Sequence, residues 1–218
     1  MFLRRKFGIK SNERVLIVGR TGTGKTYLAK HLVREYKNVV ALDTKGTLSI
    51  PNFVLVREPR NLHRIAKNSN VVFRTPWRWS NEEFDNFFLW CIERGETIVY
   101  IDELYRVASE HTRPNSPLGA IATQGRELGV ALWAATQRPS RIPTFLMSEA
   151  EHNFVFKLRL PIDRKRLEDL MEQEEPDWSE LPSDRAFYYY SIRRGLTGPY
   201  QLATRGVQDA NNRQLSAV

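Results

Sequence analysis

A glycine-rich stretch near the start of the chain carries the clearest chemical signal. It fits the pattern G-x-x-x-x-G-K-[ST] and reads Gly19-Arg20-Thr21-Gly22-Thr23-Gly24-Lys25-Thr26. An apolar run precedes it and a helical pattern follows it, as the pattern requires. Glycines let backbone N–H groups approach phosphate oxygens, while Lys25 and the helix N-terminus add positive charge. We therefore expect residues 19–26 and the neighbouring Tyr27 to bind a nucleoside triphosphate, with the Thr26 hydroxyl ligating Mg²⁺.

Two acids follow directly after another apolar run, at 97–101. Asp102 at the strand end is expected to share the Mg²⁺ with the glycine-rich stretch. Glu103 can act as a general base on an attacking water, an effect of about 10²–10⁴-fold in rate. The alternative is an acidic strand end whose charge a nearby helix N-terminus satisfies. The acid pair favours water over a kinase acceptor, and the chain has no guanine-specific N-K-x-D motif, so we expect an ATPase.

A third signal lies where an apolar run at 130–135 stops. It ends in an amide, a guanidinium and a proline, within Thr136-Gln137-Arg138-Pro139-Ser140. If the strands at 97–101 and 130–135 are neighbours, Gln137 projects from the same sheet edge as Asp102. Its amide can then hydrogen-bond the γ-phosphate or the attacking water, and Pro139 stiffens the chain that follows. The alternative is that Gln137 only satisfies backbone groups of its own loop.

The elements that must position these residues alternate between short β-rich runs and longer helical patterns. This alternation predicts an α/β fold with a mostly parallel central sheet flanked by helices. The expected strands are 14–18, 39–42, 71–73, 97–101, 130–135 and 153–159. The expected helices are 25–36, a segment from a Ser80–Glu83 capping box to about 94, and about ten residues capped by Asp163. Runs at 186–192 and 199–202 around a turn at 193–198 predict a C-terminal β-hairpin.

Length and composition limit the remaining possibilities. The 218 residues allow one domain, which we expect at 1–206, followed by a polar, loosely ordered tail at 207–218. The net charge of +8 favours a polyanionic partner, nucleic acid before an anionic membrane, although simple solubility is the plainer explanation. Cys91 is the only cysteine, which excludes an intramolecular disulfide. No apolar stretch approaches 18 residues and the start lacks a signal-peptide core, so we expect a location in the cytoplasm of the cell or host.

The combination of GRTGTGKT, VYIDE and AATQRPS resembles the FtsK–HerA superfamily of DNA-pumping P-loop ATPases. The similarity runs from about Val15 to the final hairpin. It implies a RecA-like (ASCE) core that works as a ring, most often a hexamer, with ATP between subunits. It also implies Lys25 and Thr26 on phosphate and Mg²⁺, Glu103 as the base and Gln137 as a sensor of the γ-phosphate.

The same resemblance implies an arginine finger that acts on ATP held by the neighbouring subunit. The matching position is Arg159, at the end of the expected strand 153–159; the other candidates are Arg126, Arg138 and Arg164. The alternative for Arg159 is a solvated strand-end residue. A bare core of this size is similar to the packaging ATPases of tailless icosahedral viruses with internal membranes. That similarity implies double-stranded DNA as partner, with a capsid vertex or a viral membrane protein as a possible further one and an association with the virion.

Two basic segments are candidates for contact with DNA phosphates. Arg74 and Arg78 interleave with aromatic residues at 74–79, and Arg106 and Arg113 follow the acid pair. Local packing is the alternative for the tryptophans of the first segment. A different class of function is a nucleotide-binding assembly protein at a membrane, similar to the filamentous-phage assembly ATPases. A small-molecule kinase is disfavoured, because Glu103 suits water as acceptor and no lid is recognisable.

Overall fold

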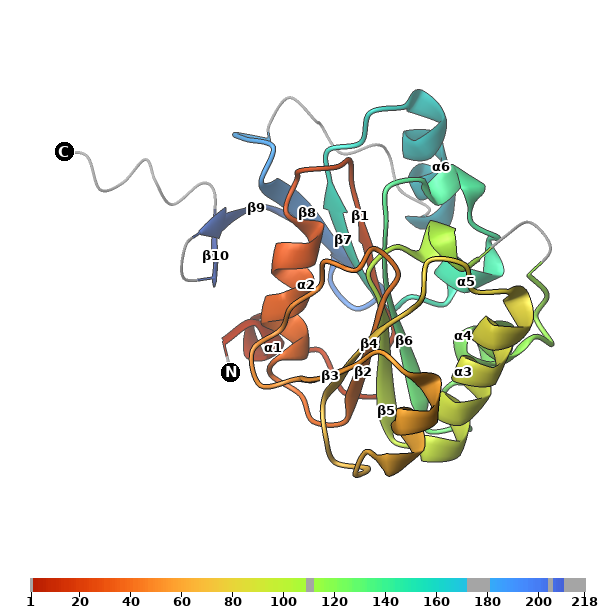
Figure 1. Ribbon diagram of the computed structural model, residues 1–218. Coiled ribbons are helices and arrows are strands. Elements are labelled where there is room, and N and C mark those ends of the chain that lie inside the picture. Colours follow the sequence, from red (N-terminus) through yellow and green to blue (C-terminus); the bar gives the residue numbers. More distant parts are fainter. Residues whose placement is uncertain (1, 109–111, 172–180, 204–205, 210–218) are drawn as a thin grey trace.

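The strands form one sheet, in which their spatial order differs from their order in the sequence. The structure, a computed structural model, describes residues 2–108, 112–171, 181–203 and 206–209. Within them ten strands follow the spatial order β10-β9-β8-β7-β1-β6-β5-β2-β4-β3 (Figure 1). Their bounds are β1 (Val15–Val18), β2 (Val39–Asp43), β3 (Val54–Val56), β4 (Val71–Arg74), β5 (Thr97–Ile101), β6 (Val130–Thr136), β7 (His152–Phe156), β8 (Ala186–Ser191), β9 (Gly195–Ala203) and β10 (Gly206–Asp209). Strands β1 to β7 pair in parallel and β8 to β10 pair antiparallel, so the predicted mostly parallel α/β fold is confirmed.

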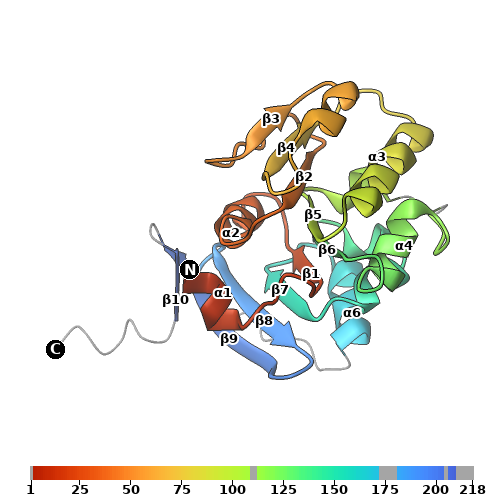
Figure 2. The same ribbon diagram turned by 90° about the horizontal axis from the view of Figure 1, so that it is seen from below.

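Helices cover both faces of this sheet. One face carries α1 (Phe2–Phe7) and α2 (Lys25–Val33), and the other carries α3 (Asn81–Arg94), α4 (Pro117–Gln124), α5 (Phe145–Ser148) and α6 (Pro161–Met171) (Figure 2). Short 3₁₀ turns complete the connections: η1 (Pro59–Arg64), η2 (Leu104–Arg106) and η3 (Pro139–Arg141). Each face has its own buried core, and β1 contributes to both, with Leu16 and Val18 on one side and Val15 and Ile17 on the other. Because successive side chains of a strand point to opposite faces, one short strand joins the two cores.

Local signals account for several of these elements. Ser80 caps α3 as expected: its hydroxyl accepts from the Glu83 amide at 3.2 Å, and the Glu83 carboxylate accepts from the Ser80 amide at 2.7 Å. Cys91 is fully buried on this helix, and burial raises the pKa of its thiol. The C-terminal hairpin is also present, but its turn is shorter than expected, since β9 begins at Gly195.

Other elements differ from the expectation. The strand predicted at 153–159 ends at Phe156, so Arg159 lies in the loop before α6. Asp163 is not an N-cap; it lies inside the first turn of α6 and faces another loop. The chain continues past the predicted tail boundary at 206 as β10, and residues 210–218 lie outside the described residues. The edge strand β3 and the short helices α1, α4 and α5 have no counterpart in the expected elements.

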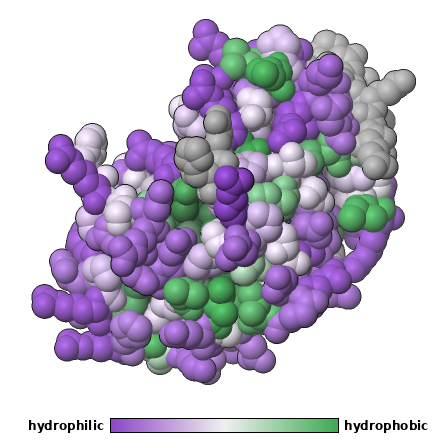
Figure 3. Space-filling model, turned by 90° about the vertical axis from the view of Figure 1, so that its right-hand side faces the viewer, coloured by the Kyte–Doolittle hydropathy of each residue, from purple (hydrophilic) through white to green (hydrophobic). Residues whose placement is uncertain are grey.

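The surface over α3 to α6 is mostly hydrophilic, with separate apolar patches (Figure 3). Leu89 of α3 and Ile162 of α6 are among the exposed large apolar residues, at 46% and 64% exposure. None of the described helices combines the length and the hydrophobicity needed to cross a bilayer.

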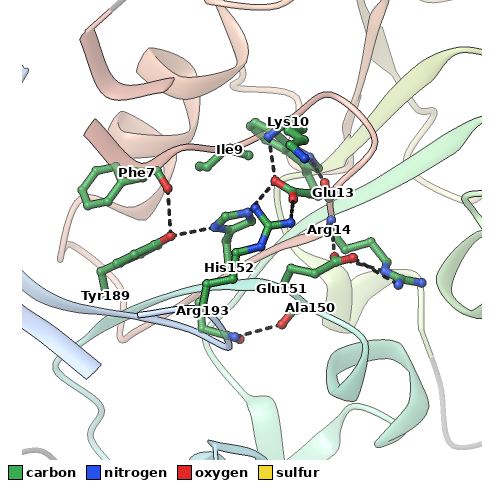
Figure 4. Close-up of polar contacts among 12 residues, drawn as sticks. Phe7, Ile9, Lys10, Glu13, Arg14, Ala150, Glu151, His152, Tyr189 and Arg193 are labelled. Carbon is green, nitrogen blue, oxygen red and sulfur yellow. Dashed lines mark hydrogen bonds and ion pairs between the residues drawn. The ribbon is translucent and has the colours of Figure 1, made fainter. Parts of the chain in front are cut away.

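A buried polar cluster joins the terminal elements at the amino edge of the sheet (Figure 4). Glu13, just before β1, accepts from Arg193 at 2.8 Å and lies 2.9 Å from Nε2 of His152. The other ring nitrogen of His152 lies 2.7 Å from the Tyr189 hydroxyl, which also contacts the backbone oxygen of Phe7 at 3.1 Å. Buried charges require such partners, so this cluster ties α1 and the hairpin to β1 and β7.

The same cluster predicts how acid affects stability. Burial lowers the pKa of His152, although its hydrogen bond to Glu13 opposes the shift. A histidine with a depressed pKa stays neutral in the fold while the unfolded chain takes up a proton near its ordinary value of 6.5. The free energy of unfolding should therefore fall as the pH drops from about 7.5 to 5.5.

We expect His152→Gln to reduce this fall, while also lowering the stability at pH 7.5 because Glu13 loses a partner. Urea unfolding at the two pH values measures both effects. His63→Gln, at an exposed position, is the matched control and should leave the pH dependence unchanged. An equal fall in His152→Gln and in the wild type would contradict the assignment.

Candidate nucleotide-binding site

The sheet brings the three sequence signals to one edge. Strands β1, β6 and β5 are parallel neighbours, with Val18 paired to Thr136 and Ile101 paired to Ala134. Their carboxyl ends therefore lie together, as ligand sites of open α/β sheets require. The predicted proximity of the strands at 97–101 and 130–135 is confirmed.

The glycine-rich loop between β1 and α2 is anchored to both neighbouring strands. The Gly19 amide donates to the Thr136 oxygen at 3.2 Å, and the Arg20 amide donates to the Lys157 oxygen at 3.0 Å. Within the loop, the Arg20 oxygen accepts from the Thr23 hydroxyl and from the Lys25 ammonium group, each at 2.9 Å. These contacts stabilise a compact loop, and the Lys25 ammonium group donates to the backbone of that loop.

Packing explains why two of the loop positions are glycine. A Cβ on Gly24 would lie 2.4 Å from Cδ1 of Leu202 on β9, and the residue has φ +100°. A Cβ on Gly19 would lie 2.5 Å from Cβ of Phe156 at the end of β7. The loop therefore lies directly against the hairpin and β7, and a side chain at either position would displace it.

Lys25 is a cation in an unusual setting. Its side chain is 7% exposed, and burial lowers the pKa of its ammonium group to about 8, helped by the nearby Lys45 and opposed by Glu103 and Asp102. A partly desolvated ammonium group attracts an anion more strongly than a solvated one does. This position suits a phosphate ligand.

The Asp102 carboxylate lies beside the glycine-rich loop. Its Oδ1 accepts from the Thr26 hydroxyl at 2.8 Å and from the Tyr100 hydroxyl at 2.7 Å. The side chain is only 3% exposed. A hydroxyl and a carboxylate oxygen so close together are the protein ligands that Mg²⁺ takes in sites completed by substrate phosphates and water. The residues present therefore fit the predicted metal site.

Glu103 and Gln137 are in direct contact. The side-chain amide of Gln137 donates to Oε2 of Glu103 at 2.8 Å, and its backbone amide donates to Oε1 at 3.2 Å. The Gln137 oxygen in turn accepts from the Thr21 hydroxyl of the glycine-rich loop. Gln137 thus connects the glycine-rich loop to Glu103.

The structure adds two residues that the sequence signals did not include. Lys45, in the loop after β2, lies 3.3 Å from Oε2 of Glu103 and 3.6 Å from Oδ2 of Asp102. Asp163 accepts from the amide and the hydroxyl of Ser140, at 3.1 and 2.5 Å, and pairs with Arg138 at 3.8 Å. Asp163 therefore anchors the turn that follows Gln137 and also forms an ion pair with Arg138.

The remaining predicted residues are spread more widely, and Arg126, which precedes the amino end of β6, lies at the opposite edge of the sheet from this centre. Arg159 is exposed in the loop between β7 and α6, and Arg126 pairs with Glu151 at 2.6 Å. Arg164 lies on α6, whereas Arg20 pairs with Asp184. The Tyr27 hydroxyl donates to the Ala203 oxygen on β9 at 2.8 Å, so this side chain is directed at the hairpin.

The DNA candidates divide into two groups. Arg74 pairs with the buried Asp43 at 2.9 Å, and Arg106 donates to the Thr44 oxygen at 2.9 Å. Arg106 is nevertheless exposed, as are Arg78 and Arg113. The two tryptophans of the first segment also differ: Trp79 packs against Phe73, with ring centroids 5.1 Å apart, and Trp77 is 91% exposed.

A strand, a glycine-rich loop and a helix, with a hydroxyl–carboxylate pair and a glutamate at the end of β5, which β6 separates from β1, define a P-loop nucleoside triphosphatase. Residues 15–158 match the ATPase family associated with various cellular activities (AAA), and the chain belongs to that family.

Individual relatives agree with this assignment. The chain is 26% identical over 192 residues to the DNA packaging ATPase P9 of Enterobacteria phage PRD1, covering 83% of this chain and 82% of P9. The genome packaging NTPase B204 from Sulfolobus turreted icosahedral virus 2, in complex with AMP, has the same fold, with a TM-score of 0.71 at 17% identity over 87% of this chain and 97% of B204. The lactococcin-A transport/processing ATP-binding protein LcnC of Lactococcus lactis is 24% identical over 73% of this chain and 23% of its own length. The predicted resemblance to viral packaging ATPases is confirmed.

The packing of the glycine-rich loop gives a testable pair of substitutions. Gly22→Ala and Gly24→Ala both place a side chain at positive φ, at a cost of about 1–2 kcal/mol. Only Gly24→Ala also overlaps another residue, since a Cβ on Gly22 meets nothing within 4 Å. We expect Gly24→Ala to lower the free energy of unfolding more than its matched control, as measured by urea denaturation. Equal losses would show that Leu202 does not constrain the loop.

Proposed function

We propose that this protein is an ATP-hydrolysing, Mg²⁺-dependent motor that moves double-stranded DNA and packages a viral genome into a preformed capsid. The observation that carries the proposal is the contact of Glu103 and Gln137 next to the phosphate loop. Because Gln137 stands at the end of β6, a change in its contacts on ATP hydrolysis would move the chain that follows β6. The similarity to the DNA packaging ATPase P9, over most of both chains, supports DNA as the substrate of the motion.

The chemistry follows from the roles of the side chains. Glu103 takes a proton from water, the water oxygen forms a bond to the γ-phosphorus, and the bond from that phosphorus to the β–γ bridging oxygen breaks. ADP and inorganic phosphate are the products. Lys25 holds the β- and γ-phosphates, and Gln137 orients the water or the γ-phosphate. Thr26 and Asp102 would hold Mg²⁺, which would neutralise charge on the phosphates.

The coupling to motion would pass through the chain after Gln137. When this side chain exchanges Glu103 for the γ-phosphate, the turn that Pro139 stiffens and Asp163 anchors would shift with it. That turn leads towards α5 and α6, on the face opposite α2. ATP hydrolysis would in this way displace α5 and α6 relative to the sheet.

DNA contact is proposed for the exposed members of the two basic segments. Arg78 and the neighbouring Trp77 form a basic and aromatic pair on the loop after β4. Arg113 is exposed on the segment that follows the acid pair. Arg106 is also exposed and stays a candidate, although it donates to the Thr44 oxygen, whereas Arg74 pairs with the buried Asp43. A ring motor grips duplex DNA mainly through phosphates, for which arginine is well suited.

The working form is proposed to be a homo-oligomeric ring, with a hexamer as the expected size, in the host cytoplasm or attached to the virion. A capsid vertex or a viral membrane protein is the proposed docking partner. Arg159 is proposed as the arginine finger, because it stands at the position that the resemblance implies and is exposed, as contact with a neighbouring subunit requires. An arginine supplied by a neighbouring subunit contributes about 10³–10⁵-fold in rate.

The central test measures ATP turnover with and without long duplex DNA across a series of salt concentrations. We expect stimulation that weakens as salt rises, because phosphate contacts release counterions. Glu103→Gln should still bind ATPγS but lose about 10²–10⁴-fold in turnover, whereas the exposed Glu93→Gln should resemble the wild type. Absence of stimulation at low salt would contradict the motor, and normal turnover in Glu103→Gln would contradict the base.

The finger is tested by mixing subunits. Arg159→Ala and Lys25→Ala should each be inactive alone, because one lacks the finger and the other lacks the phosphate-binding lysine. A mixture should regain part of the activity, since an intact site forms where an intact finger meets an intact loop. Arg60→Ala, an exposed arginine on η1, is the control. Full activity of Arg159→Ala alone would exclude this residue.

A further inference from the structure

We propose that Lys45 binds the γ-phosphate of ATP and makes the site prefer a triphosphate to a diphosphate. The proposal rests on the proposed ATPase function and adds a phosphate ligand that lies outside the glycine-rich loop. Its starting point is the ion pair between the Lys45 ammonium group and Oε2 of Glu103 at 3.3 Å.

The position of the base locates the lysine relative to the substrate. A general base must lie within hydrogen-bond reach of the water that attacks the γ-phosphorus. A cation 3.3 Å from Glu103 is therefore within a few ångströms of the γ-phosphate oxygens, and further from the α- and β-phosphates.

The loop that carries Lys45 is built to hold it there. Asp43, fully buried at the end of β2, accepts from the backbone amides of Thr47 and Leu48 at 3.2 and 3.0 Å. Arg74 donates to the same carboxylate at 2.9 Å and to the Leu48 oxygen at 3.1 Å. These contacts close residues 43–48 into a fixed turn, although the Lys45 side chain itself is 30% exposed.

A second brace comes from the segment after the acid pair. Arg106 of η2 donates to the Thr44 oxygen at 2.9 Å. The turn is thus held from β4 through Arg74 and from η2 through Arg106, and both arginines introduce the segments proposed to meet DNA. Hydrogen bonds therefore join the loop of Lys45 to the two segments proposed to meet DNA.

The chemistry of lysine allows it to serve both the acid and the phosphate. An ammonium group has three donors and behaves as a compact charge on a flexible stem. Gln137, the other side chain that donates to Oε2 of Glu103, is also a phosphate-binding group. Both donors to the base are therefore side chains that a γ-phosphate attracts, so phosphate binding and release of the Glu103 carboxylate are linked.

The alternative role for Lys45 is that of a plain counter-ion to two buried carboxylates. The two roles predict different nucleotide affinities. A counter-ion affects ATPγS and ADP alike, because both occupy the same glycine-rich loop. A γ-phosphate ligand affects only ATPγS.

The experiment compares the dissociation constants of ATPγS and ADP, each with Mg²⁺, for the wild type and Lys45→Met. We expect Lys45→Met to weaken ATPγS binding on the order of tenfold to a hundredfold, as for one charge-assisted hydrogen bond, and to leave ADP binding within about twofold. Lys37→Met, an exposed lysine close to the amino end of β2, is the matched control and should change neither. Lys45→Arg should keep the preference for ATPγS.

Equal weakening of both nucleotides, or none, would overturn the γ-phosphate role and leave the ATPase proposal intact. A wild type that binds neither nucleotide would instead overturn the proposed function itself. Thermal unfolding confirms that each variant is folded. If Lys45→Met does not fold, Lys45→Gln keeps a donor for Glu103 without the charge and gives the same comparison.

Discussion

The placement of the Glu103 carboxylate is the constraint on which the site depends. This side chain is 2% exposed, and an ionised group so deeply buried needs partners that replace its water. It obtains them from two separate parts of the chain: Gln137, through its side chain and its backbone amide, and Lys45. Strands β5, β6 and β2 must therefore lie next to one another for the charge to be tolerated. The need to pair the buried Glu103 carboxylate therefore links the strand order of the central sheet to the chemistry of the site.

The sequence predicts the parts of this site that obey local rules. The phosphate loop has a fixed residue spacing, and the acid pair follows an unmistakable apolar run, so both are visible without a structure. The proximity of Gln137 to Asp102 also follows, because neighbouring parallel strands place their carboxyl ends together. The α3 capping box is equally local, since Ser80 and Glu83 are three residues apart.

Lys45 and Asp163 could not be predicted in the same way, because their roles come from contacts distant in sequence. Lys45 meets Glu103 across 58 residues, and only the pairing of β2 with β5 brings them together. Asp163 has the sequence appearance of a helix cap, yet its carboxylate satisfies a loop 23 residues earlier. The early end of β7 has a similar origin: the chain turns after Phe156, where the Lys157 oxygen receives the Arg20 amide of the phosphate loop. Periodicity cannot report competition between distant partners.

Because Gly24 packs against Leu202, the conformation of the glycine-rich loop depends on the position of the C-terminal hairpin. Two positions far apart in the sequence meet there, and the hydroxyl of Tyr27 donates to the Ala203 oxygen, so α2 is also held to the hairpin. The antiparallel strands thus support the glycine-rich loop from behind. A change that moved the hairpin away from α2 would loosen this loop without altering any of its own residues.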